Sequence, residues 1–517
     1  MTNGVEVMDD VRCDVAIVGF GPSGSVAAAL LARLGHRVWV GDRLADVYDK
    51  PRAIALDHEI LRVFQELGLD EAVAAHTEPF TDSCYYGVDG QLIRRMTMLA
   101  PPYPQAWTPS VVFDQPSMER ALRAVVAQLP GATVQLGAEV VALAQDETGA
   151  TITLADGARV RARYVVGCDG ASGRVRAWAG LPLEDLGFDE PWLVVDVLAN
   201  DRGLARLPRH SVQYCEPHRP CTYIIGPGRH RRWEISLRPG EDPAQAATPA
   251  GTWALLKRWI TPEDGQLWRQ ASYRFHALVA QRWREGRVLI AADAAHQQPP
   301  FLGQGMCQGI RDVANLTWKL DAVLRGLAGD ALLDSYGSER QAHVRELTRR
   351  LKAIGAVIGE RDEARARARD ARLLEEVGGQ VAPTARQDVL PRLEVGVLAS
   401  SDTPGRGVLF PQAWLKGAGQ VERMDQRLGR GWRLFTRSLD VAPSPAGVVP
   451  ALHAHALEDL DEVDGVLAQW FERMRCRAAL VRPDHYVFGT ADDLAGVNRL
   501  LDEASRWYSR PVQTTGD

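Results

Sequence analysis

The stretch Asp14-Val-Ala-Ile-Val-Gly-Phe-Gly-Pro-Ser-Gly-Ser-Val-Ala-Ala-Ala-Leu-Leu-Ala32 decides how this chain folds. An apolar run typical of a buried strand ends at Gly19, and an alanine-rich run typical of a helix follows Gly24. Gly19 allows a tight turn, Gly21 lets the backbone approach a pyrophosphate, and Gly24 lets the helix pack closely on the strand. The pattern predicts a dinucleotide-binding cradle at a helix N-terminus.

A second apolar strand, from His36 to Gly41, ends at Asp42. An acidic side chain about twenty residues beyond such a cradle accepts hydrogen bonds from an adenosine ribose. We therefore count Asp42 and the adjacent Arg43 among the cofactor-binding candidates. These features fit FAD and NAD equally well.

Composition narrows the function classes. The chain has 517 residues and a net charge of -6, with no basic stripe among aromatic residues, so a nucleic-acid partner is not expected. No apolar run approaches the length of a membrane span, and the acidic N-terminal stretch has no apolar core, which predicts a cytoplasmic protein without a membrane partner. The seven cysteines are scattered without a C-x-x-C pair, so we predict neither a disulfide framework nor a metal site.

Three further positions carry polar side chains where a cofactor would lie. Arg52 follows Pro51 in a loop beyond the second strand, although a plain surface arginine fits the same pattern. Gln115 precedes a proline at a helix start, which predicts a contact with a cofactor phosphate or ring edge. Asp169 ends an apolar strand as Asp-Gly, a pair that also occurs in ordinary turns.

The pattern changes in the middle of the chain. The proline-rich stretch 80–107 is predicted to leave the first domain and cover a substrate. Residues 183–280 alternate as strands with few long helices, which predicts an antiparallel sheet. A strand then ends at Asp293, and the loop Gly303-Gln304-Gly305 opens another helix through Met306.

Together these stretches resemble the flavoprotein aromatic hydroxylases of the para-hydroxybenzoate hydroxylase type. Within that family the order of Pro51-Arg-Ala-Ile, Cys215-Glu-Pro-His-Arg-Pro and Leu333-Asp-Ser-Tyr is most similar to the branch that hydroxylates 3-(3-hydroxyphenyl)propionate. The resemblance covers nearly the whole chain and is weakest from Gln380 onward.

The resemblance implies an α/β fold with three parts. A Rossmann-like FAD-binding domain would take residues 1–182 and 281–377, with an antiparallel-sheet substrate domain at 183–280 between its halves. Residues 378–407 would be a linker, and 408–517 a thioredoxin-like C-terminal domain. Because that domain has no C-x-x-C, it is expected to pack or form a homodimer rather than perform dithiol chemistry.

The implied chemistry is monooxygenation. NADH or NADPH reduces FAD, O₂ adds to form a flavin C4a-hydroperoxide, and its distal oxygen passes to a small phenolic ring ortho to the existing hydroxyl. The cofactor-binding residues implied by the motifs are Gly19, Gly21, Gly24, Asp42, Arg43, Arg52, Gln115, Asp169, Asp293, Gly303, Gly305 and Met306.

The resemblance also suggests residues at the reacting ring. Arg52 would stabilise negative charge on the reduced flavin, and the Pro299 carbonyl would line the ring edge and the substrate. His296 would either shuttle the phenolic proton or support its loop. Arg219 and Tyr223 would hold a substrate carboxylate and hydroxyl, unless they are ordinary strand residues.

Two departures from the family pattern concern FAD affinity. The family usually has glycine where Ala292 stands and often asparagine where Cys307 stands. A methyl group close to the cofactor and a weaker polar side chain beside its ring are expected to reduce FAD affinity.

Two other functions fit the same motifs. One is a tailoring hydroxylase that acts on an aromatic polyketide or another polycyclic product. The other is a reductase-like flavoprotein that transfers no oxygen.

Overall fold

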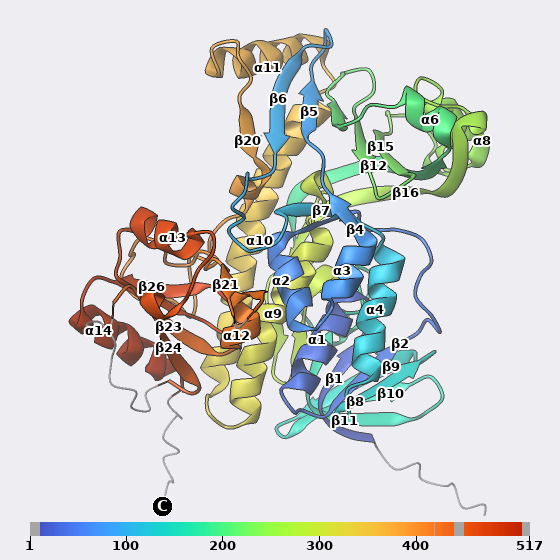
Figure 1. Cartoon of the computed structure of the whole chain (residues 1–517). Helices are drawn as coiled ribbons and strands as arrows, with labels where there is room; N and C mark the ends of the chain where they lie inside the picture. The colour runs from blue at the N-terminus through green and yellow to red at the C-terminus, as the bar shows by residue number, and fades with distance from the viewer. Residues whose placement is uncertain (1–10, 418, 439–448, 509–517) are drawn as a thin grey trace, which may run out of the picture.

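The computed structural model describes residues 11–417, 419–438 and 449–508, which form three main sheets with their helices (Figure 1). At the centre of the first sheet, β1 (Val11–Val18) runs parallel to β11 (Arg159–Gly167) and to β2 (Val38–Asp42). Val15, Ala16 and Ile17 of β1 are buried, which explains the continuous apolar run. The other strands are β8 (Ala132–Leu136), β9 (Val140–Asp146), β10 (Gly149–Leu154), β17 (Arg284–Glu285) and β18 (Val288–Ile290).

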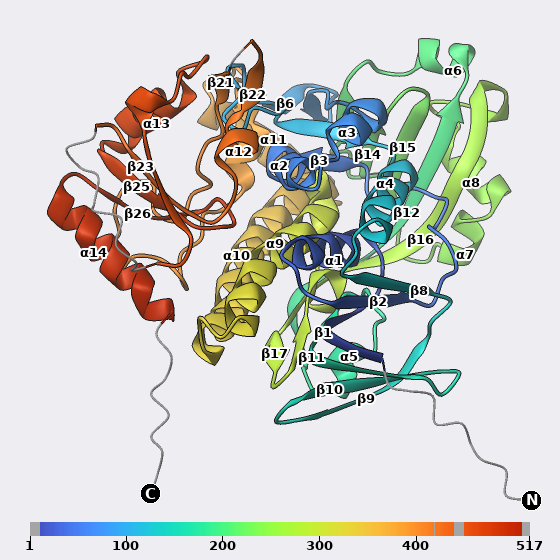
Figure 2. The ribbon, with the colours of Figure 1, turned by 60° about the horizontal axis from the view of Figure 1, so that its bottom comes forward.

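Helix α1 (Pro22–Arg33) links β1 to β2 and packs against α4 (Gln115–Ala127) and α9 (Gly305–Leu324). Figure 2 shows α1 between the first sheet and the pair formed by α9 and α10 (Asp330–Gly359). Pro22 suits the first turn, where its missing N–H has no intrahelical acceptor to lose. The carboxyl ends of the parallel strands therefore meet the N-terminus of α1 at one edge of the sheet.

The second sheet has nine strands, and two of them are long and antiparallel: β12 (Leu183–Ala199) and β16 (Gly265–Ala280). The 80–107 excursion supplies two more strands, so it belongs to this sheet. The segment expected to be a linker, 378–407, supplies another, because its strand pairs with Arg95–Thr97. The remaining strands are β5 (Ser83–Tyr86), β6 (Leu92–Thr97), β13 (Ser211–Tyr214), β14 (Cys221–Ile225), β15 (His230–Ser236), β19 (His296–Gln297) and β20 (Pro383–Ala385).

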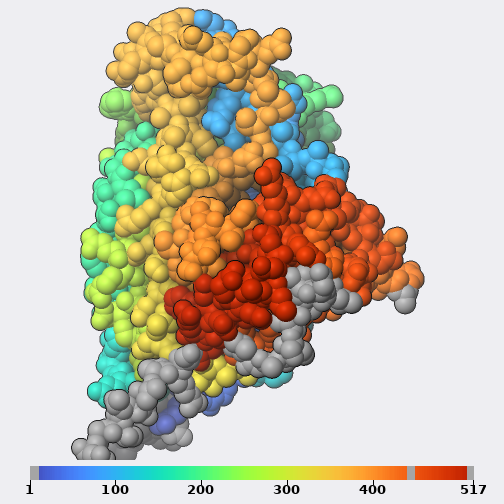
Figure 3. Space-filling model, turned by 90° about the vertical axis from the view of Figure 1, so that its left-hand side faces the viewer, coloured from blue at the N-terminus to red at the C-terminus, as the bar shows by residue number. Residues whose placement is uncertain are grey.

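The C-terminal unit contains a four-stranded sheet in the order β24-β23-β25-β26. β24 is parallel to β23, whereas β25 and β26 are each antiparallel to the preceding neighbour in that order. The unit lies against the side of the molecule that carries α10 (Figure 3), and Trp432 packs edge-on against Trp318 of α9. Its elements are β23 (Trp432–Thr436), β24 (Leu452–Ala456), α13 (Val466–Met474), β25 (Ala478–Val481), β26 (Val487–Ala491) and α14 (Leu494–Ser505).

The described chain has further α-helices and strands. They are β3 (Ala55–Asp57), α2 (His58–Glu66), α3 (Asp70–His76), β4 (Thr77–Pro79), β7 (Ser110–Phe113), α5 (Val175–Trp178), α6 (Asp201–Arg206), α7 (Pro243–Ala246), α8 (Pro249–Leu256), α11 (Glu363–Glu376), β21 (Trp414–Lys416), β22 (Val421–Arg423) and α12 (Met424–Leu428). In the described ranges, no helix combines the length and apolar character needed to cross a membrane.

Candidate active site

A cavity of about 630 Å³ runs from the carboxyl edge of the first sheet to one face of the second sheet. We call the part lined by Gly19, Gly21, Asp42 and Asp169 the cradle end. We call the part lined by Phe80, Tyr85, Thr222, Ile224, Glu234, Phe301 and Arg386 the sheet end. The loop before α9 lies between them, so one space joins the predicted cofactor cradle to the second sheet.

The three cradle glycines are required for different reasons. Gly19 has a φ of +101°, and a Cβ there would lie 2.4 Å from the carbonyl oxygen of Cys168. A Cβ on Gly24 would lie 1.9 Å from the carbonyl oxygen of Gly19, so helix and strand touch through the backbone. A Cβ on Gly21 would meet no described atom within 4 Å. Gly21 therefore leaves open space at the N-terminus of α1, where a pyrophosphate would lie.

Asp42 lies at the end of β2 and faces the cavity. Its two carboxylate oxygens accept hydrogen bonds from the backbone N–H groups of Phe20 and Leu44, each at 2.8 Å. These bonds orient the carboxylate and tie the end of β2 to the glycine turn. Arg43 is exposed beside it and also lines the cavity.

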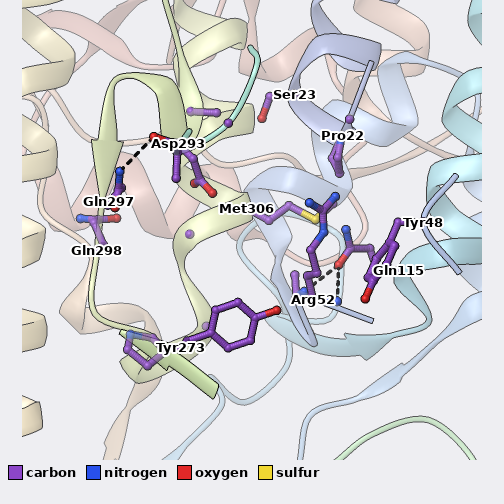
Figure 4. Close-up of a pocket in the computed structure, with 18 of the residues that line it drawn as sticks. Pro22, Ser23, Tyr48, Arg52, Gln115, Tyr273, Asp293, Gln297, Gln298 and Met306 are labelled. Atoms are coloured by element: carbon purple, nitrogen blue, oxygen red, sulfur yellow. Dashed lines mark hydrogen bonds between the residues drawn. The ribbon is translucent and has the colours of Figure 1, made fainter. Parts of the chain in front are cut away.

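Two more carboxylates open into the same space. Asp169 Oδ2 accepts from the backbone N–H of Val175 at 3.0 Å, whereas its buried Oδ1 has no hydrogen-bond partner among the described residues. Asp293 follows β18 and lies opposite Met306 and Arg52 in Figure 4. Burial raises the pKa of the Asp169 carboxyl, and desolvation within the cavity raises that of Asp293, although the residue as a whole is exposed. Hydroxyl groups of a ribose or ribityl chain would satisfy these acceptors.

The N-terminus of α9 completes the cofactor side of the cavity. Gly303 has a φ of +62°, and Gly303, Gly305 and Met306 line the space. No side chain caps the first turn of this 20-residue helix, so its N–H groups and positive dipole end are available to an electron-rich ring. With the open space at Gly21 and the unpartnered Asp169 oxygen, this part of the cavity fits FAD.

Of the two departures from the family pattern, the structure supports a contact with the cofactor for Ala292 but not for Cys307. Ala292 lines the cavity with a φ of +57°, in the left-handed region that favours the family's usual glycine. Cys307 is buried in the core on the other side of α9, with its sulfur 3.8 Å from the carbonyl oxygen of Ala55. Burial raises the pKa of the Cys307 thiol. It does not line the cavity, so it offers no polar group to a flavin ring.

Arg52 lies in a firmly anchored loop (Figure 4). The side-chain oxygen of Gln115 accepts from the backbone N–H groups of Arg52 and Ala53, at 2.9 and 2.6 Å. Arg232 donates to the carbonyl oxygen of Arg52 at 2.8 Å. The Arg52 guanidinium lies 5.7 Å from the Tyr48 ring and has no carboxylate partner within the described ranges. Gln115 therefore positions the Arg52 loop, although its side chain also lines the cavity.

Pro299 differs from its expected placement, whereas His296 matches one of its two expected alternatives. His296 Nε2 is 2.8 Å from the Asp312 carboxylate, and its ring stacks on Trp283. Because Asp312 also accepts from the backbone N–H of Ala292, this contact matches the loop-supporting alternative. Pro299 is buried outside the cavity lining, and the neighbouring Pro300 lines the cavity in its place.

Arg219 and Tyr223 do not line the cavity, so the structure gives no support to their assignment as substrate ligands. Arg219 donates to both carboxylate oxygens of Glu241, at 2.6 and 2.7 Å, and is already neutralised. Tyr223 packs on Trp233 in the core behind the sheet. Successive strand residues face opposite sides, so Thr222 and Ile224 are the residues of β14 that face the cavity.

Sequence reasoning missed two charged residues at the sheet end. Glu234 on β15 is 7% exposed, and its carboxylate makes no hydrogen bond or ion pair with another described residue. Arg386 comes from the segment taken for a linker and is 9% exposed. Strand alternation alone would have placed Glu234 with Arg232, two residues earlier. No local signal marks Arg386.

Comparisons with known proteins agree with this geometry. A family described as FAD binding domain matches residues 12–351, and a second, HcaD C-terminal domain, matches 407–505. A probable NADH-specific resorcinol 4-hydroxylase from Rhodococcus jostii (strain RHA1) is 36% identical over 95% of this chain and 94% of its own. A 3-(3-hydroxy-phenyl)propionate/3-hydroxycinnamic acid hydroxylase from Mycobacterium sp. (strain JLS) is 33% identical over 93% and 89%.

Two solved structures share the fold. The flavin-dependent monooxygenase PieE, in complex with FAD and substrate, has a TM-score of 0.81 at 24% identity, covering 98% of this chain and 100% of that one. Aklavinone-11 hydroxylase, in complex with FAD and aklavinone, has a TM-score of 0.78 at 24% identity, covering 96% and 100%. The resemblance noted in the sequence is thereby confirmed.

Proposed function

This chain belongs to the FAD-binding domain family, and from that premise we propose that it hydroxylates a small phenolic ring at the carbon next to an existing hydroxyl. It is an FAD-dependent aromatic monooxygenase. One ring C–H becomes C–OH, O₂ supplies that oxygen and the oxygen of one water, and NAD(P)H with a proton supplies two electrons. The name of the Rhodococcus relative favours NADH as the reductant.

The observation that carries this proposal is the single cavity with two differently built ends. The cradle end offers backbone N–H groups and ribose-binding carboxylates, whereas the sheet end offers aromatic and aliphatic walls. Bound FAD supplies the oxygen chemistry there. The protein has to bind both molecules, orient them and exclude water.

We assign the cofactor to the motif residues that line the cradle. Gly19 and Gly21 would admit the pyrophosphate, with Gly24 keeping helix and strand in contact. Asp42 and Arg43 would contact the adenosine half. Asp169 and Asp293 would accept from cofactor hydroxyls. Gly303, Gly305 and Met306 would place the N-terminus of α9 against the flavin pyrimidine, where reduction adds negative charge.

Other side chains that line the cavity would take the remaining tasks. Arg52, anchored by Gln115, would stabilise negative charge at the flavin or hold the incoming nicotinamide. Phe80, Ile224 and Phe301 would enclose the substrate ring and keep water away. The Glu234 carboxylate would accept the phenolic proton, because it opens into the cavity with no ion-pair partner of its own in the described chain.

For the C-terminal unit we propose a thioredoxin-like fold over residues 408–517. The order β24-β23-β25-β26, with one parallel and two antiparallel pairings followed by α14, supports it. Residues 439–448, between β23 and β24 in the chain, lie outside the described residues. Without a C-x-x-C pair the unit would serve packing rather than redox chemistry.

The test compares 3-(3-hydroxyphenyl)propionate with 3-phenylpropionate, which lacks the ring hydroxyl. Oxygen transfer needs the electron density that a hydroxyl supplies to the ortho carbon, so only the phenol should give a hydroxylated product. The second compound should at most accelerate NADH oxidation with release of hydrogen peroxide. Equal hydroxylation of both compounds per NADH would contradict the proposal.

The same assay addresses the alternatives. Stimulation by a large aromatic polyketide but by no small phenol would point to a tailoring hydroxylase. NADH oxidation without oxygen uptake would point to a reductase. The likeness to aklavinone-11 hydroxylase does not favour either alternative, because at 24% identity it shows the fold alone.

A further inference from the structure

Nearly all buried arginines in the described chain form an ion pair with a carboxylate. Nine arginines are buried in the described chain, and eight of them form an ion pair with an aspartate or glutamate. Arg386 is the ninth, and no described carboxylate lies within ion-pair distance of it. The eight paired residues are Arg62, Arg232, Arg269, Arg311, Arg340, Arg369, Arg433 and Arg482.

The position of Arg386 places this unmatched charge at the sheet end of the cavity. It follows β20, which pairs with the edge strand β6, and one guanidinium nitrogen donates to the carbonyl oxygen of Leu302. The guanidinium carbon lies 4.3 Å from the centre of the Phe80 ring. No other described acceptor bonds to the guanidinium, which lines the cavity.

The positive charge of Arg386 has no counter-ion among the described residues. A buried guanidinium loses its hydration, and neither a carbonyl dipole nor a phenyl face neutralises a full charge. Burial accordingly lowers the pKa of Arg386, although an arginine stays protonated. Glu234 lines the same end of the cavity, but it lies beyond ion-pair distance of Arg386.

We propose that Arg386 binds the carboxylate of the substrate, so that the enzyme selects phenols with an anionic side chain over neutral phenols. The planar guanidinium has the geometry to bind a carboxylate through two parallel hydrogen bonds. The inference rests on the proposed hydroxylase function. It separates the two kinds of relative, because resorcinol is neutral whereas 3-(3-hydroxyphenyl)propionate carries a carboxylate.

The experiment measures the dissociation constants of 3-(3-hydroxyphenyl)propionate and its primary amide with the FAD-loaded enzyme, by calorimetry and by change in flavin absorbance. The two ligands have nearly the same shape, so their ratio isolates the charge. The wild type should bind the acid about 10- to 100-fold more tightly than the amide. Arg386→Met should bring the ratio close to one at unchanged flavin content, and Arg386→Lys should give an intermediate ratio.

Arg219→Met is the matched control, because it removes an arginine from the same sheet domain whose charge Glu241 already neutralises. It should leave the acid-to-amide ratio unchanged. A wild type that binds both ligands equally would overturn the inference even if Arg386→Met failed to fold. A wild-type acid-to-amide ratio in Arg386→Met would also overturn the inference, and so would a changed ratio in Arg219→Met.

Product analysis keeps this inference distinct from the hydroxylase proposal. If acid and amide bind equally and both become catechols, the hydroxylase function stands and the anion site is rejected. If no phenol gives a catechol, the hydroxylase function is rejected. A persistent preference for the acid would then still report an anion site at Arg386.

Discussion

At the scale of single residues, Gly21 and Gly24 at the start of α1 differ in what an added side chain would meet. A side chain at Gly21 would enter open space, whereas one at Gly24 would collide with the backbone at Gly19. Gly21→Leu should therefore fold but carry little FAD, because the leucine fills the pyrophosphate site. Gly24→Leu should instead lower the stability of the folded protein. Flavin absorbance per protein and thermal unfolding by circular dichroism separate these effects, and a Gly21→Leu protein with full flavin content would refute the cradle assignment.

Glu234 makes a second prediction at this scale. Burial raises the pKa of its carboxyl from 4.5 to about 7, so the folded state holds this proton more tightly than the unfolded chain. Stability from this group is therefore fully present at low pH and is lost as pH rises through about 7, by up to about 3 kcal/mol. Glu234→Gln should be more stable than the wild type at pH 8 but not at pH 4.

The same substitution tests the proton acceptor. Ionised Glu234 would give a kcat that rises with pH through about 7, and Glu234→Gln should lose this rise with a kcat about 100-fold lower. Glu216→Gln, which removes one partner of an ion pair with Arg258 in the same domain, is the control and should keep the wild-type profile. An unchanged pH profile in Glu234→Gln would mean that another group takes the proton.

At the scale of secondary structure, substitutions on the two faces of β14 should have different effects on substrate binding. Ile224 faces the cavity and Tyr223 faces the core, where its hydroxyl lies 3.4 Å from the Pro208 carbonyl oxygen. Tyr223→Phe should leave KM unchanged. Ile224→Trp should raise KM at least about tenfold through lost space, with normal flavin content. The reverse pattern in steady-state kinetics would place the substrate on the other face.

Some of these positions could be predicted from the sequence and others could not. Gly19, Gly21, Gly24 and Asp42 were predictable because short-range spacing dictates a tight turn and a strand end. The face of a strand is set by register with neighbours far along the chain, so Tyr223 was assigned to the wrong side. Arg386 reaches the cavity only because β20 pairs with a strand almost 300 residues earlier in the chain.

At the scale of the whole molecule, buried charges join the C-terminal unit to the FAD-binding part. Asp425 of α12 accepts from Arg62 of α2 and from Arg433 of β23, at 2.5 and 2.6 Å. Burial opposes ionisation of Asp425, but Arg62, His485 and Arg433 hold the pKa of this carboxyl well below its usual range. Such a contribution is present above the ordinary carboxyl pKa and is lost as pH falls.

This arrangement predicts how the two parts unfold. Asp425→Asn leaves two buried guanidinium groups without their carboxylate, which should cost about 3–5 kcal/mol. Because Arg62 and Arg433 lie on opposite sides of the interface, the loss should fall on the contact between the two parts. Calorimetry should resolve two thermal transitions in the variant and one in the wild type. Asp461→Asn, in an exposed pair with Lys416 at 3.5 Å, should change stability by less than about 0.5 kcal/mol. A single transition with an unchanged midpoint in Asp425→Asn would show that apolar contacts such as Trp318 with Trp432, rather than the buried charges, hold the C-terminal unit in place.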